Sequence, residues 1–287
     1  MARKHSGGWL GTLLTVGTFL FLAWMERKRP LRVNVEPKLR REGRNLAVAG
    51  VAAAAIQLAG APVVRPLTRL VERRRWGLLT RVRLPRWLEI TTALLLMDYT
   101  FYLWHVVTHK TPALWRFHIA HHSDLDLDAS TALRFHFGEL LAGVPWQAAQ
   151  IVLFGLTPAT YSMWQTAFLI SILFHHSDLR IPIKWEQPLS WLMVTPRMHG
   201  IHHSIVEQES NSNWSSGLSL WDRLHGTLRL NVPQQEVTIG VPAFREPQPL
   251  GSIISMPFRQ LPQSWVLPDG TRPAEREEIA QSGKLLA

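Results

Sequence analysis

Residues 116–136 read RFHIAHHSDLDLDASTALRFH and place four of the chain's 13 histidines in one short stretch. Three of the four form the pattern H-x2-H-H, which recurs once further along the chain, and an H-x3-H pair precedes it. Residues three and four positions apart share one face of a helix, so each cluster can aim two or three imidazoles at one point. These clusters comprise His105, His109, His118, His121, His122, His199, His202 and His203.

Imidazole nitrogens bind iron, copper, zinc and nickel, and eight converging rings exceed the ordinary coordination of one ion. The clusters therefore predict two metal ions, each held by several nitrogens. A zinc peptidase is disfavoured because the segment from His105 to His109 lacks the glutamate of H-E-x-x-H. A b-type haem is disfavoured because the clusters lie at or beyond the ends of apolar runs and contain adjacent histidines.

The composition is that of a membrane protein. Of the 287 residues 46% are hydrophobic, yet the net charge is +10. Basic loops beside anionic head groups account for this combination. The arginines cluster beside apolar runs rather than along one polar face, which argues against a nucleic-acid partner. The absence of cysteine excludes disulfides, thiolate metal sites and a cysteine nucleophile.

Apolar runs predict the helices that cross the bilayer. They cover Trp9 to Met25, Leu46 to Val64, Trp87 to Trp104 and Leu140 to Phe174, the last long enough for a helical hairpin that turns near residues 156–159. We therefore predict an all-α integral membrane protein with about four transmembrane helices in two hairpins. The histidine clusters would then share one face of the bilayer.

Two strongly basic segments complicate the topology. Residues 26–45 and residues 65–86 each carry eight Lys and Arg, and the positive-inside rule cannot place both in the cytoplasm if the second apolar run spans. The alternative is that one of the runs is interfacial or re-entrant. After Thr227 prolines recur and the chain reads as irregular, water-exposed covering structure. Three regions are expected: residues 1–86 as a membrane region with basic loops, 87–228 as the catalytic domain, and 229–287 as a Pro-rich tail.

A two-metal, all-histidine site at a membrane surface is suited to non-haem di-iron oxygen chemistry. Neutral imidazoles leave the metal pair electropositive, which favours the binding of peroxide or oxide derived from O2. Such a species attacks an unactivated C–H bond and gives an alcohol or an alkene. Lipid substrates would enter sideways from the bilayer.

From about Leu95 to Thr227 the chain resembles the fatty acid hydroxylase/sterol desaturase superfamily of membrane di-iron oxygenases. The resemblance rests on LLLMDYTFYLWHVVTH, LWRFHIAHHSDLDLDASTALRFHFGE, LFHHSDLRIP, VTPRMHGIHHS and NSNWSSGLSLWDRLHGT in this order. It implies a four-helix membrane base under a cytosolic cap that holds two irons. The family's ligands fall on the eight clustered histidines and on His176, with His175 the less favoured neighbour.

Several other residues are candidates for supporting roles. Asp98 lies two helical turns before His105, where a carboxylate could accept a ring N–H or pair with an arginine for assembly. His136 is a ligand, a residue hydrogen-bonded to a ligand, or a stacked core residue. We expect Arg134 and Glu139 to form an ion pair beside the site. The remaining candidates are Asp124, Asp126 and Asp128, which either orient histidines or form a solvated loop, and Asp222, which braces the cap.

These features predict an O2-dependent lipid C–H oxidase, a hydroxylase rather than a desaturase, with its histidine site on the cytoplasmic face. The alternative is a membrane metal-binding or transport protein that uses the same histidines. A G-x-G-x-x-G fingerprint and cluster-binding cysteines are both absent. Electrons are therefore expected from a separate donor, such as a ferredoxin or a cytochrome b5-like protein.

Overall fold

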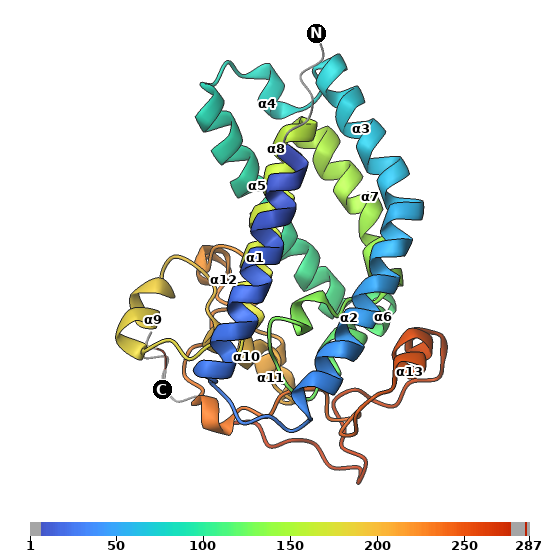
Figure 1. Cartoon of the computed structure of the whole chain (residues 1–287), viewed down its shortest axis with the longest axis vertical. Coiled ribbons are helices and arrows are strands. Elements are labelled where there is room, and N and C mark those ends of the chain that lie inside the picture. Colours follow the sequence, from blue (N-terminus) through green and yellow to red (C-terminus); the bar gives the residue numbers. More distant parts are fainter. Residues whose placement is uncertain (1–6, 277–284, 286–287) are drawn as a thin grey trace.

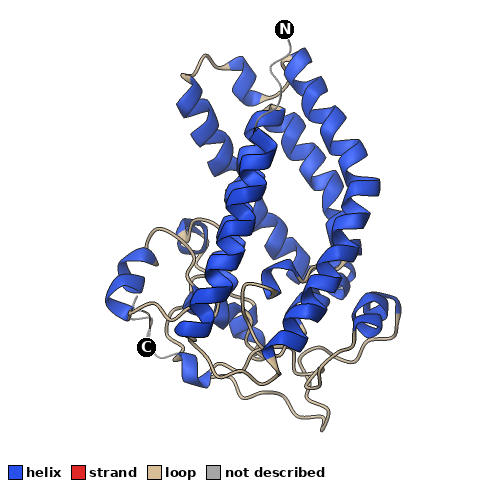
Figure 2. Cartoon of the chain, in the orientation of Figure 1, coloured by secondary structure: helices blue, strands red, loops and turns tan. Residues whose placement is uncertain are grey.

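The computed structural model describes residues 7–276 and Leu285. Among these residues the regular elements are helices, and extended pairing is limited to four isolated bridges (Figure 2). The all-α prediction is confirmed. The long helices run along the long axis of the molecule, and the histidine-bearing helices α6 and α10 lie near its lower end (Figure 1).

The N-terminal region contributes two long rods. Helix α1 (Gly7–Lys28) packs against α8, and α2 (Lys38–Ala55) continues through the π-helical turn η1 (Ile56–Gly60) into α3 (Ala61–Arg74), which packs against α7. The second apolar run is thus part of one continuous rod, not a re-entrant loop. Its two basic flanks lie at opposite ends of the molecule, since the short helix α4 (Leu78–Arg81) follows α3 at the upper end (Figure 1).

Helix α5 (Arg86–Lys110) returns to the lower end, and α6 (Pro112–His122) lies across it there. Helices α7 (Phe137–Phe154) and α8 (Pro158–His176) follow after the 3-10 turn η2 (Thr131–Leu133). Three helices of the described chain are long and apolar enough to cross a membrane: Trp9–Lys28, Lys38–Arg81 and Arg86–Lys110. The described chain therefore has the helices of a membrane protein.

The predicted hairpin near residues 156–159 is confirmed as the α7–α8 connection. Gly155 ends α7 in the left-handed region with φ 81°, where a Cβ would lie 2.5 Å from the carbonyl oxygen of Trp76. A side chain is therefore excluded by conformation and by space. Thr157 then caps α8 by accepting a hydrogen bond from the N–H of Thr160, and Pro158 occupies the first helical turn.

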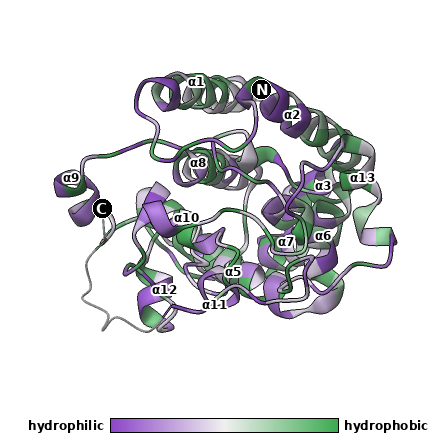
Figure 3. Ribbon diagram, turned by 90° about the horizontal axis from the view of Figure 1, so that it is seen from below, coloured by the Kyte–Doolittle hydropathy of each residue, from purple (hydrophilic) through white to green (hydrophobic). Residues whose placement is uncertain are grey.

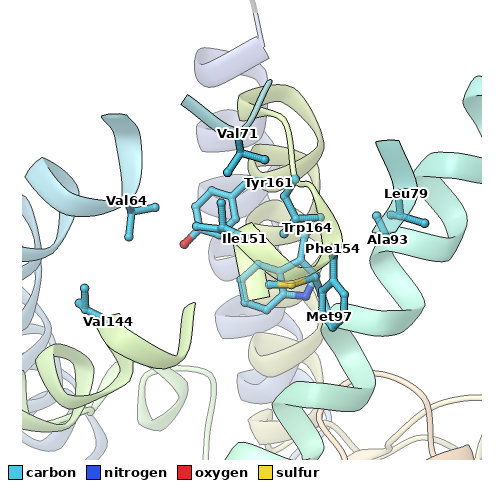
Figure 4. Packing of buried hydrophobic residues seen from close by; sticks show 11 residues of the cluster. Val64, Val71, Leu79, Ala93, Met97, Val144, Ile151, Phe154, Tyr161 and Trp164 are labelled. Carbon is cyan, nitrogen blue, oxygen red and sulfur yellow. The ribbon is translucent and has the colours of Figure 1, made fainter. Parts of the chain in front are cut away.

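The main hydrophobic core joins α3, α4, α5, α7 and α8 (Figure 4). Val71, Met97 and Ile151 are fully buried there. Large apolar side chains also cover the outer surface, among them Trp9 and Leu20, each 61% exposed, and Leu58, 81% exposed. Exposed side chains of this kind on long apolar helices are suited to contact with lipid. Seen from below, α1 is largely hydrophobic whereas the first turns of α2 are hydrophilic (Figure 3).

Short elements close the lower end. They are α9 (Ile183–Leu189), α10 (Pro196–His202), α11 (Glu207–Ser210), α12 (Leu220–Leu224), η3 (Gln234–Glu236), α13 (Leu250–Ser255) and η4 (Met256–Phe258). The segment after residue 229 is irregular, as expected, but it is not merely a water-exposed cover. Val241 and Ile253 are fully buried, and Ser264 accepts a hydrogen bond from the indole of Trp115 on α6.

Candidate metal centre

Nine histidines converge at the lower end of the helices and divide into two groups. Within each group the candidate ligand nitrogens all lie within 4.8 Å of one another. The groups adjoin, because the rings of His122 and His203 stack with centroids 4.3 Å apart. The five-histidine group contains His105, His109, His118, His122 and His202, and the four-histidine group contains His121, His176, His199 and His203.

Four helices bring these rings together. The end of α5 carries the H-x3-H pair, α6 carries the first H-x2-H-H box, and α8 ends at His176. Helix α10, together with the residue that follows it, carries the second box. Thr195 caps its N-terminus by accepting a hydrogen bond from the N–H of Met198, and Pro196 fixes its first turn. The buried pair of Arg197 with Glu186 then ties α10 to α9.

The ring nitrogens of the four-histidine group face one another. His176 Nε2 lies 3.1 Å from His121 Nε2 and 2.9 Å from His199 Nε2. The Nε2 atoms of His199 and His203 are 3.1 Å apart. Neutral imidazoles that present lone pairs to one another at this distance need a proton or a cation between them. The contact geometry therefore indicates a cation site.

In the five-histidine group the rings are held from behind. His105 Nδ1 donates to the carbonyl oxygen of Trp214 at 2.7 Å, and His202 Nδ1 donates to that of Ser212 at 2.8 Å. His118 Nδ1 lies 2.8 Å from a carboxylate oxygen of Glu139. A hydrogen bond at Nδ1 fixes the tautomer in which Nε2 keeps its lone pair, as metal-binding histidines require.

The nitrogens directed inward suit a metal ion. Eight of the nine histidines are buried, and nitrogens without a hydrogen-bond partner include His118 Nε2, His202 Nε2 and both ring nitrogens of His122. Buried polar atoms seldom lack a partner unless an ion or water binds them. Burial lowers the pKa of His202 to about 3 and lowers the pKa of His199 and His203 well below the usual value. These three rings are therefore neutral and able to coordinate.

At the end of α8 the structure separates two adjacent histidines. His176 belongs to the four-histidine group, and its Nδ1 donates to the carbonyl oxygen of Ile172 at 2.7 Å. His175 is buried beside it, with its ring centroid 4.1 Å from that of His199, but it belongs to neither group. The geometry thus agrees with the preference for His176 as the candidate ligand.

Asp98 does not hold a histidine, contrary to the expectation from its spacing. Its Oδ2 accepts from the N–H of Leu218 at 2.9 Å and from the indole of Trp221 at 2.7 Å. A Cβ on Gly217 would lie 2.2 Å from Asp98 Oδ1, so the loop approaches the carboxylate closely. Asp98 therefore fastens α5 to the segment that leads into α12.

The expectations for Arg134, His136 and Glu139 also need correction. Arg134 does not pair with Glu139, because its guanidinium donates to the carbonyl oxygen of Ala120 and to the side chain of Asn45. His136 contacts neither histidine group. Its Nδ1 caps α7 by accepting from the N–H of Gly138, and its Nε2 donates to the carbonyl oxygen of Ile254. Glu139, in the first turn of α7, instead has a carboxylate oxygen 2.8 Å from His118 Nδ1.

The three aspartates after the first box neither orient histidines nor lie in water. Asp124, Asp126 and Asp128 are buried, and the fully buried guanidinium of Arg41 on α2 forms ion pairs with all three. This network ties the loop that follows His122 to the second rod. Sequence spacing gave no signal for it, since Arg41 lies about 80 residues away in a segment that reads as a basic loop.

Asp222, which we expected to brace a cap, holds the loop between α11 and α12. Its carboxylate accepts from the N–H groups of Trp214 and Ser215 and from the hydroxyl of Thr227. Asn213, at φ 50°, occupies the left-handed region and donates to the carbonyl oxygen of Met198 in α10. This loop carries the carbonyl group of Trp214, so Asp222 acts on the five-histidine group through the backbone.

An apolar cavity leads from the helices to the histidines. We call it the central cavity; it has a volume of about 450 Å³ and lies between α2, α5, α7 and α8. A small inner pocket of about 20 Å³ is lined by histidines of both groups. Phe135, Glu139, Phe168 and Ile172 line both spaces, so the central cavity adjoins the histidine site through a mostly apolar wall.

Comparison with known proteins agrees with this arrangement. Residues 90–227 match the fatty acid hydroxylase family. The chain is 32% identical over 161 residues to ornithine lipid hydroxylase OlsE of Rhizobium tropici. The matched region covers 55% of this chain and 46% of that protein. It is 29% identical to alkylglycerol monooxygenase of Xenopus tropicalis, over 49% of this chain and 30% of that protein.

Human cholesterol 25-hydroxylase is 27% identical to the chain over 49% of this chain and 51% of that enzyme. The chain thus spans between 30% and 51% of the length of these three curated relatives. No solved structure matches the chain. The matched residues include the nine converging histidines, Glu139 and the loop braced by Asp222. The family match over residues 90–227 and the curated relatives together support a place for this region in the fatty acid hydroxylase superfamily.

Proposed function

We propose that the chain is an O2-dependent lipid hydroxylase that uses two iron ions. One observation carries the proposal: the two histidine groups, which are largely buried, adjoin the inner end of an apolar cavity whose walls are the long helices. The similar proteins are named as hydroxylases and monooxygenases that act on lipids, which favours hydroxylation over desaturation.

The donor set fits iron. The nine histidines offer ring nitrogens, and one carboxylate oxygen of Glu139 lies 2.8 Å from His118 Nδ1, at the back of that ring. With imidazoles alone as ligands, no negative charge offsets that of the metal ions. Iron bound by the two groups would supply the activation of O2 that breaks an unactivated C–H bond.

The residues of the chain hold and screen this site. Glu139 keeps the proton at His118 Nδ1. The carbonyl oxygens of Trp214 and Ser212 orient the rings of His105 and His202, respectively. Phe135 stacks on His121 with ring centroids 4.4 Å apart. This phenyl ring, together with Phe168 and Ile172, excludes water and guides a hydrocarbon chain toward the histidines.

The same cavity argues against a metal carrier. A transported cation requires polar groups along its path, because charge in a membrane interior is costly. The central cavity is instead lined largely by aromatic and aliphatic side chains, including Trp104, Leu140 and Trp146. Such a wall suits a lipid chain and not a hydrated ion.

Two further features belong to the proposal. Electrons come from a separate protein of the ferredoxin or cytochrome b5 type. The histidine end faces the cytoplasm, where such donors are reduced.

The first test is the metal content of the purified protein. We expect about two iron ions per chain, and we expect His121→Ala to lower the iron content and abolish lipid hydroxylation while the protein still inserts. Lipid extracts from cells with and without the gene should differ by the mass of one oxygen atom. Full iron retention in His121→Ala would refute the assignment of the site.

The orientation has its own test. Because the native chain has no cysteine, a single cysteine can be introduced at each end of the molecule. Val33, which is 92% exposed, lies in the loop between α1 and α2, and Trp76 lies in the turn after α3. A membrane-impermeant maleimide added to intact cells should label Trp76→Cys and spare Val33→Cys; the reverse pattern would overturn the orientation.

A further inference from the structure

A second cavity adjoins the central cavity on the side away from the histidines. We call it the outer cavity; it has a volume of about 340 Å³ and lies between α3 and the α7–α8 hairpin. Gln57, Gln147, Tyr161 and Gln165 line both cavities. Figure 4 shows the hydroxyl group of Tyr161 directed toward the space between Val64 and Val144, which line the outer cavity. The two cavities and the inner pocket therefore form one row.

The two ends of this row differ in charge. Of the residues that the structure describes, those lining the outer cavity include two arginines and no acidic residue. Arg65 and Arg69 lie one helical turn apart on α3, and both are exposed. Arg65 donates to Gln57 Oε1 at 2.8 Å. The central cavity contributes one carboxylate, Glu139, at its opposite end. Guanidinium groups in this position suit a phosphate or carboxylate group.

Carboxamides mark the junction between the outer and central cavities. Gln57, Gln147 and Gln165 come from three different helices and line both cavities. Tyr161 donates to Gln147 Oε1 at 2.9 Å, which holds this carboxamide in place. Amide N–H groups donate to carbonyl oxygens. A junction lined by three carboxamides therefore suits the ester or amide linkages that join a headgroup to its acyl chains.

The distance from this junction to the histidines corresponds to a length of hydrocarbon. Gln165 precedes His176 by eleven residues in α8, which is about 16 Å along the helix. Gln147 follows Glu139 by eight residues in α7, or about 12 Å. An acyl chain whose linkage lies at the carboxamides would place its interior carbons, and not its α-carbon, at the inner pocket.

We propose that the substrate is an acyl lipid with an anionic headgroup, and that Arg65 and Arg69 bind this headgroup at the end of the cavity row opposite the histidines. The inference rests on the proposed lipid hydroxylase function and specifies its substrate. The ester or amide linkage lies among the three glutamines. The acyl chain fills the central cavity and is hydroxylated at a carbon well beyond the linkage.

The test measures binding separately from turnover. Metal-free protein in nanodiscs is examined by native mass spectrometry with phosphatidylglycerol and phosphatidylcholine of identical acyl chains. We expect phosphatidylglycerol to bind in preference, and we expect Arg65→Gln combined with Arg69→Gln to lower this preference about fivefold for each arginine removed. Arg73→Gln, exposed on the same helix but outside the outer cavity, is the matched control and should keep the preference.

Each other outcome overturns the inference. Equal binding of the two lipids, an unchanged preference in the double variant, or the same loss in Arg73→Gln would remove the headgroup site. Displacement of phosphatidylglycerol by inorganic phosphate alone would assign the arginines to a free anion. In the metal-loaded enzyme, a product hydroxylated at the α-carbon would contradict the placement of the chain. A protein that binds the lipid as expected but hydroxylates nothing would refute the proposed function and leave the headgroup site intact.

Discussion

The two histidine groups lie side by side but are held by different means. Three rings of the five-histidine group donate through Nδ1 to fixed acceptors, namely Glu139 and the carbonyl oxygens of Ser212 and Trp214. In the four-histidine group only His176 has such a bond among residues 7–276 and Leu285, and the rings are placed by direct contacts between their Nε2 atoms. The first group is preorganised from outside, whereas the second depends on its own members.

This difference predicts unequal tolerance to damage. A five-membered set of ligands that loses one ring still offers four nitrogens, which is enough for ordinary coordination. A four-membered set that loses one ring offers three and also loses a contact that positions its neighbours. We therefore expect the four-histidine group to be the more fragile of the two.

The largest effect should come from two adjacent residues of the second box. His203→Ala should lower the iron content from about two ions to about one per chain, whereas His202→Ala should retain close to two. We expect both variants to lose hydroxylase activity, since each alters the centre itself. Elemental analysis by plasma mass spectrometry measures the difference, and His225→Ala, outside both groups, serves as the control. Equal iron loss in the two variants would contradict the expected difference in tolerance between the two histidine groups.

The second prediction concerns helix α6 and the loop that follows it, which support both histidine groups. Both take ligands from α6, and the Arg41 network holds the loop that follows this helix. Arg41→Met should destabilise the protein by about 3–5 kcal/mol, because it leaves buried carboxylates without a counter-charge. Arg40→Met, on the exposed side of the same helix, should change stability by less than about 0.5 kcal/mol.

Thermal unfolding in detergent measures this stability, and iron analysis of the same samples completes the test. Because α6 supplies both groups, we expect their iron to be lost together as the protein is heated. If only one group released its iron in Arg41→Met, the loop would not be a common support.

The sequence predicted the helices and the histidines because both leave local signals. Apolar runs marked the long helices, and repeated H-x2-H-H spacing marked rings that share a helix face. The α7–α8 turn was also predictable, since Gly155 and Pro158 interrupt one apolar stretch. These features depend on neighbours within a few residues of the chain.

The partners of charged residues were not predictable in the same way. Asp98 was assigned to a histidine on its own helix, whereas its donors lie more than 100 residues away. Arg134 and Glu139 were paired because they are close in sequence, but the start of α7 separates them. A carboxylate accepts hydrogen bonds from whichever donors the tertiary fold brings near. The spacing of residues along the sequence therefore does not predict these partners.

A smaller effect is expected from Glu139, whose carboxylate contacts a histidine of the five-histidine group. Glu139→Gln keeps an oxygen acceptor but removes the charge behind His118, so we expect the iron affinity of the five-histidine group to fall about 10- to 100-fold. In the described part of the chain the hydrogen bond of Glu139 goes to His118 and not to the four-histidine group, which should therefore bind iron as before. Stepwise removal of iron with a chelator measures the two affinities. Glu89→Gln, which removes only a surface ion pair with Arg86, should match the wild type; equal weakening of both groups would argue that they act as one site.

The smallest effect concerns Asp98, the carboxylate that the sequence placed beside His105. Because its Oδ2 accepts from Leu218 and Trp221 instead, an asparagine oxygen can accept the same two hydrogen bonds. Asp98→Asn should therefore cost only about 1 kcal/mol of stability and leave both iron affinities unchanged, in contrast to Glu139→Gln. Thermal unfolding and stepwise removal of iron with a chelator measure the stability and the iron affinities of Asp98→Asn and Glu139→Gln. A loss of iron affinity in Asp98→Asn as large as in Glu139→Gln would restore the first assignment, because two hydrogen bonds to the cap segment cannot by themselves change the basicity of a histidine ring.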